Sequence, residues 1–260
     1  MAEAAVRHQR SEGSILLSVG PNGLRRLREA HAAKLRLPPG SQEAILINTG
    51  GGLAGGDRFT FGITAEEGAS LIVTTQAAER VYRSLGADAE VTVTLAARPS
   101  STLMWMPQET ILFDGAALSR SIEADVQGES RFLAVESIIL GREAMGESVV
   151  QARLSDRWRI RHNGKLIFAD DLRFEGRPPA TAATLKDARA FATVLLVSPQ
   201  AEEMVERVCA AIGGIGAASA WSGKIVARLA ARDGFELRKS LIPALRILTG
   251  DAALPKTWSF

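Results

Sequence analysis

The sequence predicts a mainly β protein with a large β-rich body over residues 1–177 and a smaller C-terminal portion over residues 178–260. Through the body, short apolar segments recur about every ten to fifteen residues with turn residues between them, as in all-β folds. Helical spacing of apolar residues begins only after the proline pair Pro178-Pro179. We expect these two parts to form one continuous domain.

Eleven segments of the body are predicted to be strands. Residues 91–95 alternate apolar and polar side chains, which places one face of a strand on a core. Asn163-Gly164 favours a type I′ hairpin turn. The spacing is too irregular for a named repeat family, so the pattern fits a sandwich or a solenoid. The expected strands are 14–19, 43–48, 59–64, 70–75, 90–95, 102–106, 119–126, 132–140, 148–154, 158–162 and 165–168.

The C-terminal portion is predicted to be α/β with two helices. Val208 and Ile212 share one face of the first helix, and Gly213 ends it. Pro243 conflicts with the second helix, because an interior proline costs about 3 kcal/mol. We therefore expect that helix to begin later than residue 237 or to bend. The expected elements are strand 191–197, helix 201–212, strand 224–229 and helix 237–248.

Composition and charge exclude several function classes. The chain has 31 basic and 29 acidic residues, which leaves no concentrated basic face for nucleic acid. Cys209 is the only cysteine, so no intrachain disulfide can form and a reducing compartment is expected. No apolar run reaches the roughly 18 residues of a membrane span, and the N-terminus lacks a secretion signal. We expect a soluble, cytoplasmic protein.

The segment from Asn48 to Asp57 reads NTGGGLAGGD and contains five glycines. A phosphate-binding loop would end in Gly-Lys-Ser/Thr, whereas Asp57-Arg58 stands here. The residues that follow alternate as in a strand, so no helix N-terminus is available to hold a phosphate. Glycine permits backbone conformations and close approaches that other residues do not. We therefore expect a glycine-lined bend between adjacent strands.

The sequence offers carboxylates as its main candidates for chemistry. One cysteine and three scattered histidines do not supply a tight transition-metal site, and no Gly-x-Ser-x-Gly elbow is present. Glu136 interrupts the apolar stretch 132–140. An acid in so apolar a strand either lies on an exposed face or is held inside by a partner. A further reading is a small-molecule hydrolase that uses Glu109 and Asp114, although their spacing does not ensure that they converge.

Five segments together resemble one protein family. They are NTGGGLAGGD at Asn48, TTQAAERVYRS at Thr74, MPQETILFDGA at Met106, ESIILGREAMGE at Glu136 and LPKTWSF at Leu254. In this order they resemble the urease accessory protein family called UreD, or UreH in some bacteria. The resemblance implies an irregular, β-helix-like stack of strands with two C-terminal helices.

The resemblance also implies a function. Members of the family are non-catalytic assembly factors that bind apo-urease and, with UreF and the GTPase UreG, help to deliver nickel to the urease active site. A passive structural subunit without a metal role is the remaining reading. No tightly bound cofactor is implied; Ni²⁺ would pass through transiently.

Candidate residues for the nickel path follow from the positions of the motifs. The resemblance implies an internal water-filled passage lined by acids that fall on Asp57, Glu136 and, with a one-residue shift within 166–171, Asp170; Glu79 would lie nearby. Conduction requires sites that bind weakly enough to release the ion, and carboxylates and water meet that requirement better than a Cys/His site.

Partner contacts are expected near the C-terminus. The apolar tail residues Trp258 and Phe260 look exposed, so the helices and this tail are predicted to meet UreF. The alternative is that both side chains pack on their own domain.

Overall fold

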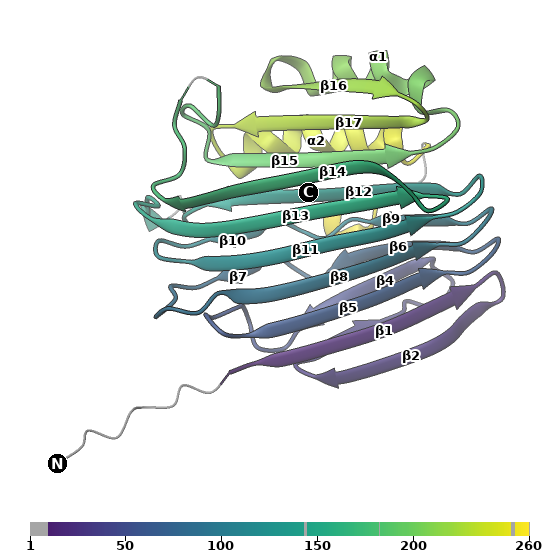
Figure 1. Cartoon of the computed structure of the whole chain (residues 1–260), viewed down its shortest axis with the longest axis horizontal. Helices are drawn as coiled ribbons and strands as arrows, with labels where there is room; N and C mark the ends of the chain where they lie inside the picture. Colours follow the sequence, from purple (N-terminus) through teal and green to yellow (C-terminus); the bar gives the residue numbers. More distant parts are fainter. Residues whose placement is uncertain (1–9, 143–144, 182, 251–252, 260) are drawn as a thin grey trace.

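The computed structural model describes residues 10–142, 145–181, 183–250 and 253–259. Within this part of the chain, 17 strands stack along one axis to form two large sheets, and two α-helices lie at the C-terminal end (Figure 1). The seven-stranded sheet contains, in spatial order, β14 (Lys165–Gly176), β13 (Ala152–His162), β11 (Ala117–Val126), β8 (Ala89–Ala97), β5 (Arg58–Ala65), β1 (Glu12–Gly20) and β2 (Gly23–His31).

The second sheet has ten strands. Its main path is β16 (Gly216–Trp221), β17 (Lys224–Ala231), β15 (Ala190–Val197), β12 (Arg131–Leu140), β9 (Thr102–Trp105), β6 (Ser70–Thr75), β4 (Glu43–Asn48) and β3 (Ala33–Arg36). Beside this path, β10 (Thr110–Leu112) pairs with both β12 and β7 (Glu79–Val81).

The body is wound like a solenoid. From β4 to β13 the longer strands alternate between the two sheets, so each turn adds one parallel strand to each sheet. Antiparallel strands close the ends, as β2 does on β1 and β14 on β13. The expected β-helix-like stack with two C-terminal helices is therefore confirmed.

Strand β12 is mostly apolar because it is buried on both faces. Alternate residues such as Phe132 and Ile138 join the core between the two sheets. Leu133 and Val135 face the opposite way and join a second core beneath the helices. Glu136 has the same parity as Phe132 and Ile138, so strand alternation directs it into the space between the sheets.

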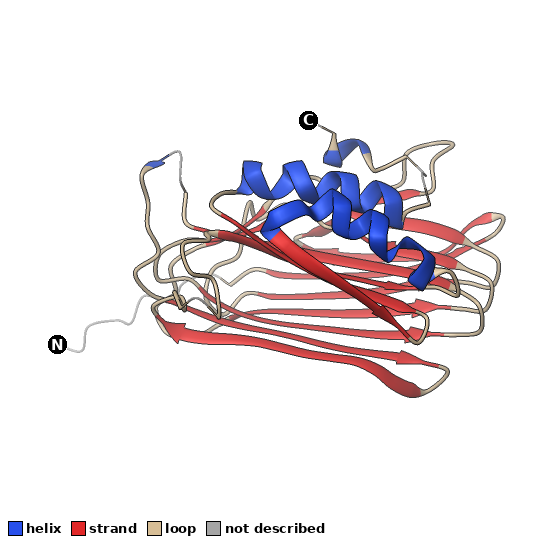
Figure 2. Ribbon diagram, turned by 90° about the horizontal axis from the view of Figure 1, so that it is seen from above, coloured by secondary structure: helices blue, strands red, loops and turns tan. Residues whose placement is uncertain are grey.

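Helices α1 (Ala201–Ile212) and α2 (Gly234–Leu248) pack side by side over one face of the C-terminal strands (Figure 2). The bounds of α1 agree with the prediction. The expectation that α2 begins after residue 237 is wrong, because Asp233 caps the helix by accepting a hydrogen bond from the Glu236 backbone N–H at 2.7 Å. Pro243 lies inside α2. Two short 3₁₀ helices are η2 (Gly213–Ile215) and η3 (Lys256–Trp258).

Several strand predictions differ from the structure. The predicted strands 148–154 and 158–162 fall on the single strand β13, which begins only at Ala152, so residues 148–151 are not strand. The hairpin from β13 to β14 turns at Asn163 and Gly164, with φ values of 50° and 79°. Strands β2, β3, β7, β10 and β16 were not predicted. The strand β2 is exposed on nearly every residue and lacks an apolar stripe, while β7 and β10 have only three residues each.

The predicted division between residues 177 and 178 stays a prediction. Strand β15 of the C-terminal portion pairs directly with β12 of the body, so one sheet continues across this position. Neither of the helices in the described ranges has the length and apolar character needed to cross a membrane.

Candidate functional site

The glycine segment joins β4 to β5 and packs closely against the chain that follows β7. A Cβ at Gly52, where φ is 149°, would lie 2.4 Å from the Tyr82 ring and 2.8 Å from the Arg80 carbonyl oxygen. A Cβ at Gly55 would lie 2.2 Å from Ser84 Oγ. The glycines therefore serve close packing of the backbone. The predicted glycine-lined bend is confirmed, with the addition that it connects the two sheets.

Asp57 holds the end of this segment together. Its carboxylate is buried and accepts hydrogen bonds from the backbone N–H of Ser11 at 2.7 Å and of Ala54 at 2.8 Å. The Asp57 N–H in turn donates to the Ala54 carbonyl. Asp57 is not among the residues that line the cavity described next. Its contacts assign it a role in folding the loop.

A cavity of about 210 Å³ lies between the two sheets beside the glycine segment. That volume accommodates several water molecules, since a water occupies about 30 Å³ in the liquid. Exposed lining residues at Gly51, Gln76, Ala77 and Arg80 mark where the cavity reaches the surface. The interior lining combines apolar side chains with a polar group comprising Asn48, Thr75, Glu79, Gln108, Thr110, Arg120 and Glu136.

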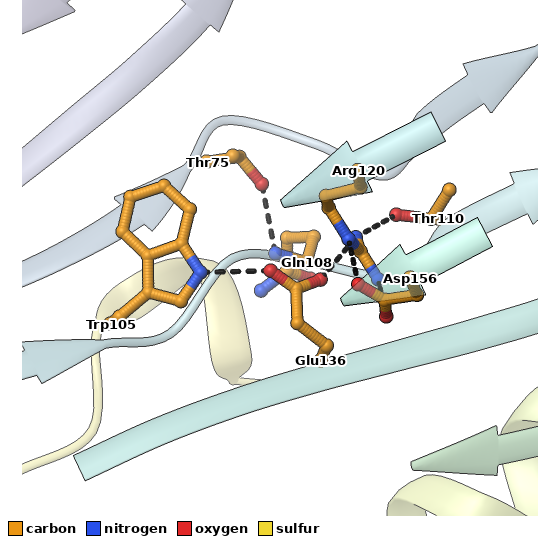
Figure 3. Close-up of polar contacts among 7 residues, drawn as sticks. All are labelled: Thr75, Trp105, Gln108, Thr110, Arg120, Glu136 and Asp156. Carbon is orange, nitrogen blue, oxygen red and sulfur yellow. Dashed lines mark hydrogen bonds and ion pairs between the residues drawn. The ribbon is translucent and has the colours of Figure 1, made fainter. Parts of the chain in front are cut away.

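Two of the lining residues, Arg120 and Glu136, belong to a buried ionic cluster (Figure 3). Arg120 on β11 reaches from the seven-stranded sheet to Glu136 on β12 of the other sheet and donates a hydrogen bond to its Oε2. The same guanidinium binds Asp156 on β13 in a bidentate manner, with Nε–Oδ1 at 3.0 Å and Nη2–Oδ2 at 2.6 Å. Trp105 Nε1 donates to Glu136 Oε1 at 2.8 Å. All three charged side chains are at most 6% exposed.

The electrostatics of the cluster are unbalanced, because two carboxylates share one guanidinium. Burial raises the pKa of Glu136 above its ordinary value; the charge of Arg120 opposes this rise and that of Asp156 adds to it. Burial alone would lower the pKa of Arg120, but the charges of Asp156 and Glu136 raise it above its ordinary value. Arg120 therefore stays charged, while the neighbouring Glu136 holds its proton more readily than an exposed glutamate does.

Glu79 lies half-buried near the opening of the cavity. Asn48 Nδ2 donates to both carboxylate oxygens, at 3.2 and 3.3 Å. Burial raises the pKa of Glu79 to about 7, although the hydrogen bond from Asn48 acts in the opposite direction. At neutral pH this carboxyl is divided between its protonated and ionised forms.

Gln108 lines the same cavity and carries an unused donor. Its backbone N–H donates to Thr75 Oγ1 at 2.8 Å, and its Oε1 accepts from Arg238 at 3.1 Å. Its Nε2 is buried and has no hydrogen-bond partner among the described residues. A buried donor of this kind calls for an acceptor inside the cavity, such as water.

The other predicted acids lie elsewhere. Asp170 on β14 forms an ion pair with Arg228 of β17 at 2.7 Å and is not part of the cavity lining. Glu109 is buried in an ion pair with Arg238 of α2 at 2.6 Å. Asp114 accepts hydrogen bonds from the backbone N–H of Val150 and Gln151. Glu109 and Asp114 are thus bound to separate partners.

Trp258 is not exposed. Only 1% of the residue is accessible, its indole Nε1 donates to the Met106 carbonyl at 2.9 Å, and the Arg238 guanidinium lies 5.1 Å from its ring. The expectation of an exposed ring is therefore wrong, because the indole fills the core beneath α2. Phe260 lies outside the described residues.

Arg120 and Asp156 were missed at the level of sequence, although the signal that singled out Glu136 applies to them. Arg120 interrupts the inward stripe of β11 between Leu118 and Ile122. Asp156 interrupts that of β13 in the same way. A charge inside an apolar period-two stripe thus marks all three members of the cluster. Among the described residues, no three His, Cys, Asp or Glu side chains come together, so a metal ion bound here would take the rest of its ligands from hydroxyl groups or water.

Comparisons with known proteins agree on one family. A family model described as UreD urease accessory protein matches residues 9–259. The chain is 45% identical to the urease accessory protein UreD of Agrobacterium fabrum strain C58, over 99% of this chain and 94% of that protein. It is 47% identical to the protein of the same name from Rhizobium etli, over 98% of this chain and 97% of that protein.

Proposed function

The chain belongs to the family of UreD urease accessory proteins, and we propose that it acts in urease maturation as a non-catalytic scaffold that helps to deliver nickel. Its partners would be apo-urease, UreF and UreG, and its place the cytoplasm. The observation that carries the nickel role is the polar cavity between the sheets, which runs from Glu79 near the surface to the buried Glu136.

The chemistry of the cavity suits a transient divalent ion. Carboxylate and water oxygens bind nickel more weakly than imidazole or thiolate does, so an ion that enters can also leave. Apolar residues such as Phe59, Phe61 and Val93 supply the rest of the wall and offer no competing ligands. The proposed path therefore uses Glu79 and Glu136. Asp57 and Asp170 lie outside the lining and are left out of it.

The alternative of a hydrolase has less support. General acid–base catalysis needs two groups that converge on one substrate. Glu109 is held by Arg238, and Asp114 is held by Arg83 and by the backbone near residue 150. The family name of the relatives also describes an accessory role.

Because Trp258 is buried, UreF would have to contact other side chains of the C-terminal portion. Phe235 on α2 is 67% exposed and Trp221 at the end of β16 is 46% exposed, so the C-terminal portion still offers apolar surface to UreF.

The test is Glu136→Gln in a urease activation assay with nickel, apo-urease, UreF and UreG. The amide can still accept from Trp105, and Arg120 keeps its bidentate pair with Asp156, so the fold should persist. We expect the variant to join the complex in a pull-down but to leave urease with several-fold less nickel and activity. The matched control is Glu123→Gln, which removes an exposed carboxylate from the outer face of β11. Full activation by Glu136→Gln would exclude the path.

A further inference from the structure

The guanidinium of Arg120 occupies a shell of oxygen atoms. Four oxygens from three side chains surround it: both carboxylate oxygens of Asp156, Oε2 of Glu136, and Oγ1 of Thr110 at 3.1 Å. The guanidinium supplies the positive charge at the centre. Two carboxylates and a hydroxyl are also ligands that a hydrated divalent cation accepts.

The shell can accept a divalent ion only after the guanidinium has left it. With both acids ionised, Glu136 and Asp156 carry two negative charges, which a doubly charged cation would balance once Arg120 has withdrawn. Two buried carboxylates without a counter-ion are costly, so the shell has an electrostatic reason to accept such an ion when the arginine is absent.

The position of Arg120 blocks access to part of this shell. Arg120 and Glu136 line the cavity, whereas Asp156 does not. The guanidinium therefore stands between the cavity and Asp156, and an ion that has reached Glu136 cannot bind Asp156 until Arg120 withdraws.

A second observation points to a hydrated ligand in the same cavity. Gln108 is 7% exposed and lines the cavity, and its Nε2 has no partner among the described residues. The water oxygens of a hydrated cation are acceptors that this donor could bind.

We propose that Arg120 is an internal gate, and that Glu136, Asp156 and Thr110 form a divalent-cation site that opens when its guanidinium withdraws. The proposal rests on the proposed function in one respect, namely that nickel is the cargo. Arg120 acts here as a positioning residue, because it controls which oxygens the cation can reach.

The experiment uses the full chain with Arg120→Met, which removes the charge but keeps much of the length, and with Arg120→Gln. Each protein is dialysed to equilibrium against a fixed concentration of Ni²⁺, and the nickel bound in excess of the free ion is measured by mass spectrometry. We expect both variants to bind stoichiometric nickel and the wild type to bind several-fold less. Added Ni²⁺ should also raise the melting temperature of the variants and not that of the wild type, because the ion binds only their folded state.

The matched control is the double variant Arg120→Met with Asp156→Asn, which keeps the net charge of the wild-type cluster but removes a ligand. It should lose the nickel. Equal binding by the double variant would place the metal elsewhere and overturn the proposal, as would folded single variants that bind none. Failure of both single variants to fold even with Ni²⁺ would also overturn it, because an ion that replaces the guanidinium must restore the cluster.

These outcomes are separate from those of the activation assay. Nickel binding is measured on this chain alone, whereas the proposed function is measured through urease. If the Arg120 variants refute the gate, the activation assay of Glu136→Gln can still be interpreted. If they bind nickel, that result alone does not support delivery of nickel to urease.

Discussion

Replacing Glu79 by glutamine should make the stability of the protein less dependent on pH. Burial raises the pKa of this carboxyl from 4.5 to about 7 in the folded chain. At about 1.4 kcal/mol for each tenfold change in proton affinity, this corresponds to up to about 3 kcal/mol. The amide that Glu79→Gln introduces keeps an oxygen that can accept from Asn48, so the loss of the charge is the main change.

The sign follows from proton binding. Between pH 4.5 and about 7 the folded chain holds a proton on Glu79 that the unfolded chain has released. The free energy of unfolding therefore falls as the pH rises through this window and then levels off. Glu79→Gln avoids this loss, so the variant should be up to about 3 kcal/mol more stable than the wild type at pH 8 and similar to it at pH 4.5.

The assay is urea unfolding at a series of pH values, with the difference between variant and wild type plotted against pH. Because other groups contribute equally to both proteins, the difference curve isolates Glu79. Glu90→Gln is the control, since its side chain is 54% exposed on the seven-stranded sheet and outside the cavity. A flat difference curve for Glu79→Gln would refute the reasoning.

Three further substitutions test the assignments made above. Asp57→Ala should lower the free energy of unfolding by about 2–3 kcal/mol, because the N–H groups of Ser11 and Ala54 lose a charged acceptor; a variant that unfolds in urea like the wild type would contradict the role in the loop. Gly52→Ala should cost at least about 1–3 kcal/mol through backbone strain and contact with Tyr82, and an unchanged melting temperature would reject the close packing. Trp258→Ala should cost about 3–5 kcal/mol, whereas a ring used only for partner binding would reduce UreF pull-down and leave thermal stability intact.

Much of the fold could be predicted from local pattern. The clean alternation in 91–95 and the Asn163-Gly164 turn indicated strands and a hairpin that the structure contains. The parallel winding could not be predicted this way, because the pairing partners of each strand are about thirty residues apart and strand periodicity carries no information on them. The resemblance to a family supplied that part. The strand β2 was missed because an exposed edge strand has no buried face to produce a pattern.

The candidate site was predictable only in part. Glu136 stood out as an acid in an apolar strand, and the structure confirms that it is held inside by a partner. Its counter-ion Arg120 lies 16 residues earlier on the opposite sheet, so only the winding of the chain brings them together. Asp57 was a candidate because it ends the glycine segment, and its carboxylate in fact stabilises that segment. Sequence alone could not distinguish a carboxylate that binds backbone N–H groups from one that faces a cavity.

The buried cluster is difficult to explain as a device for stability. Removing charges from water costs several kcal/mol for each ion, and apolar residues of similar volume often serve a core equally well or better. Here the surrounding positions are already apolar, since Leu118, Ile122 and Ile138 flank the cluster on their strands. A core built for stability alone would continue that pattern through Arg120 and Glu136. The proposed cation route offers a reason for the two carboxylates, because a hydrated ion needs oxygen ligands where the protein would otherwise be dry.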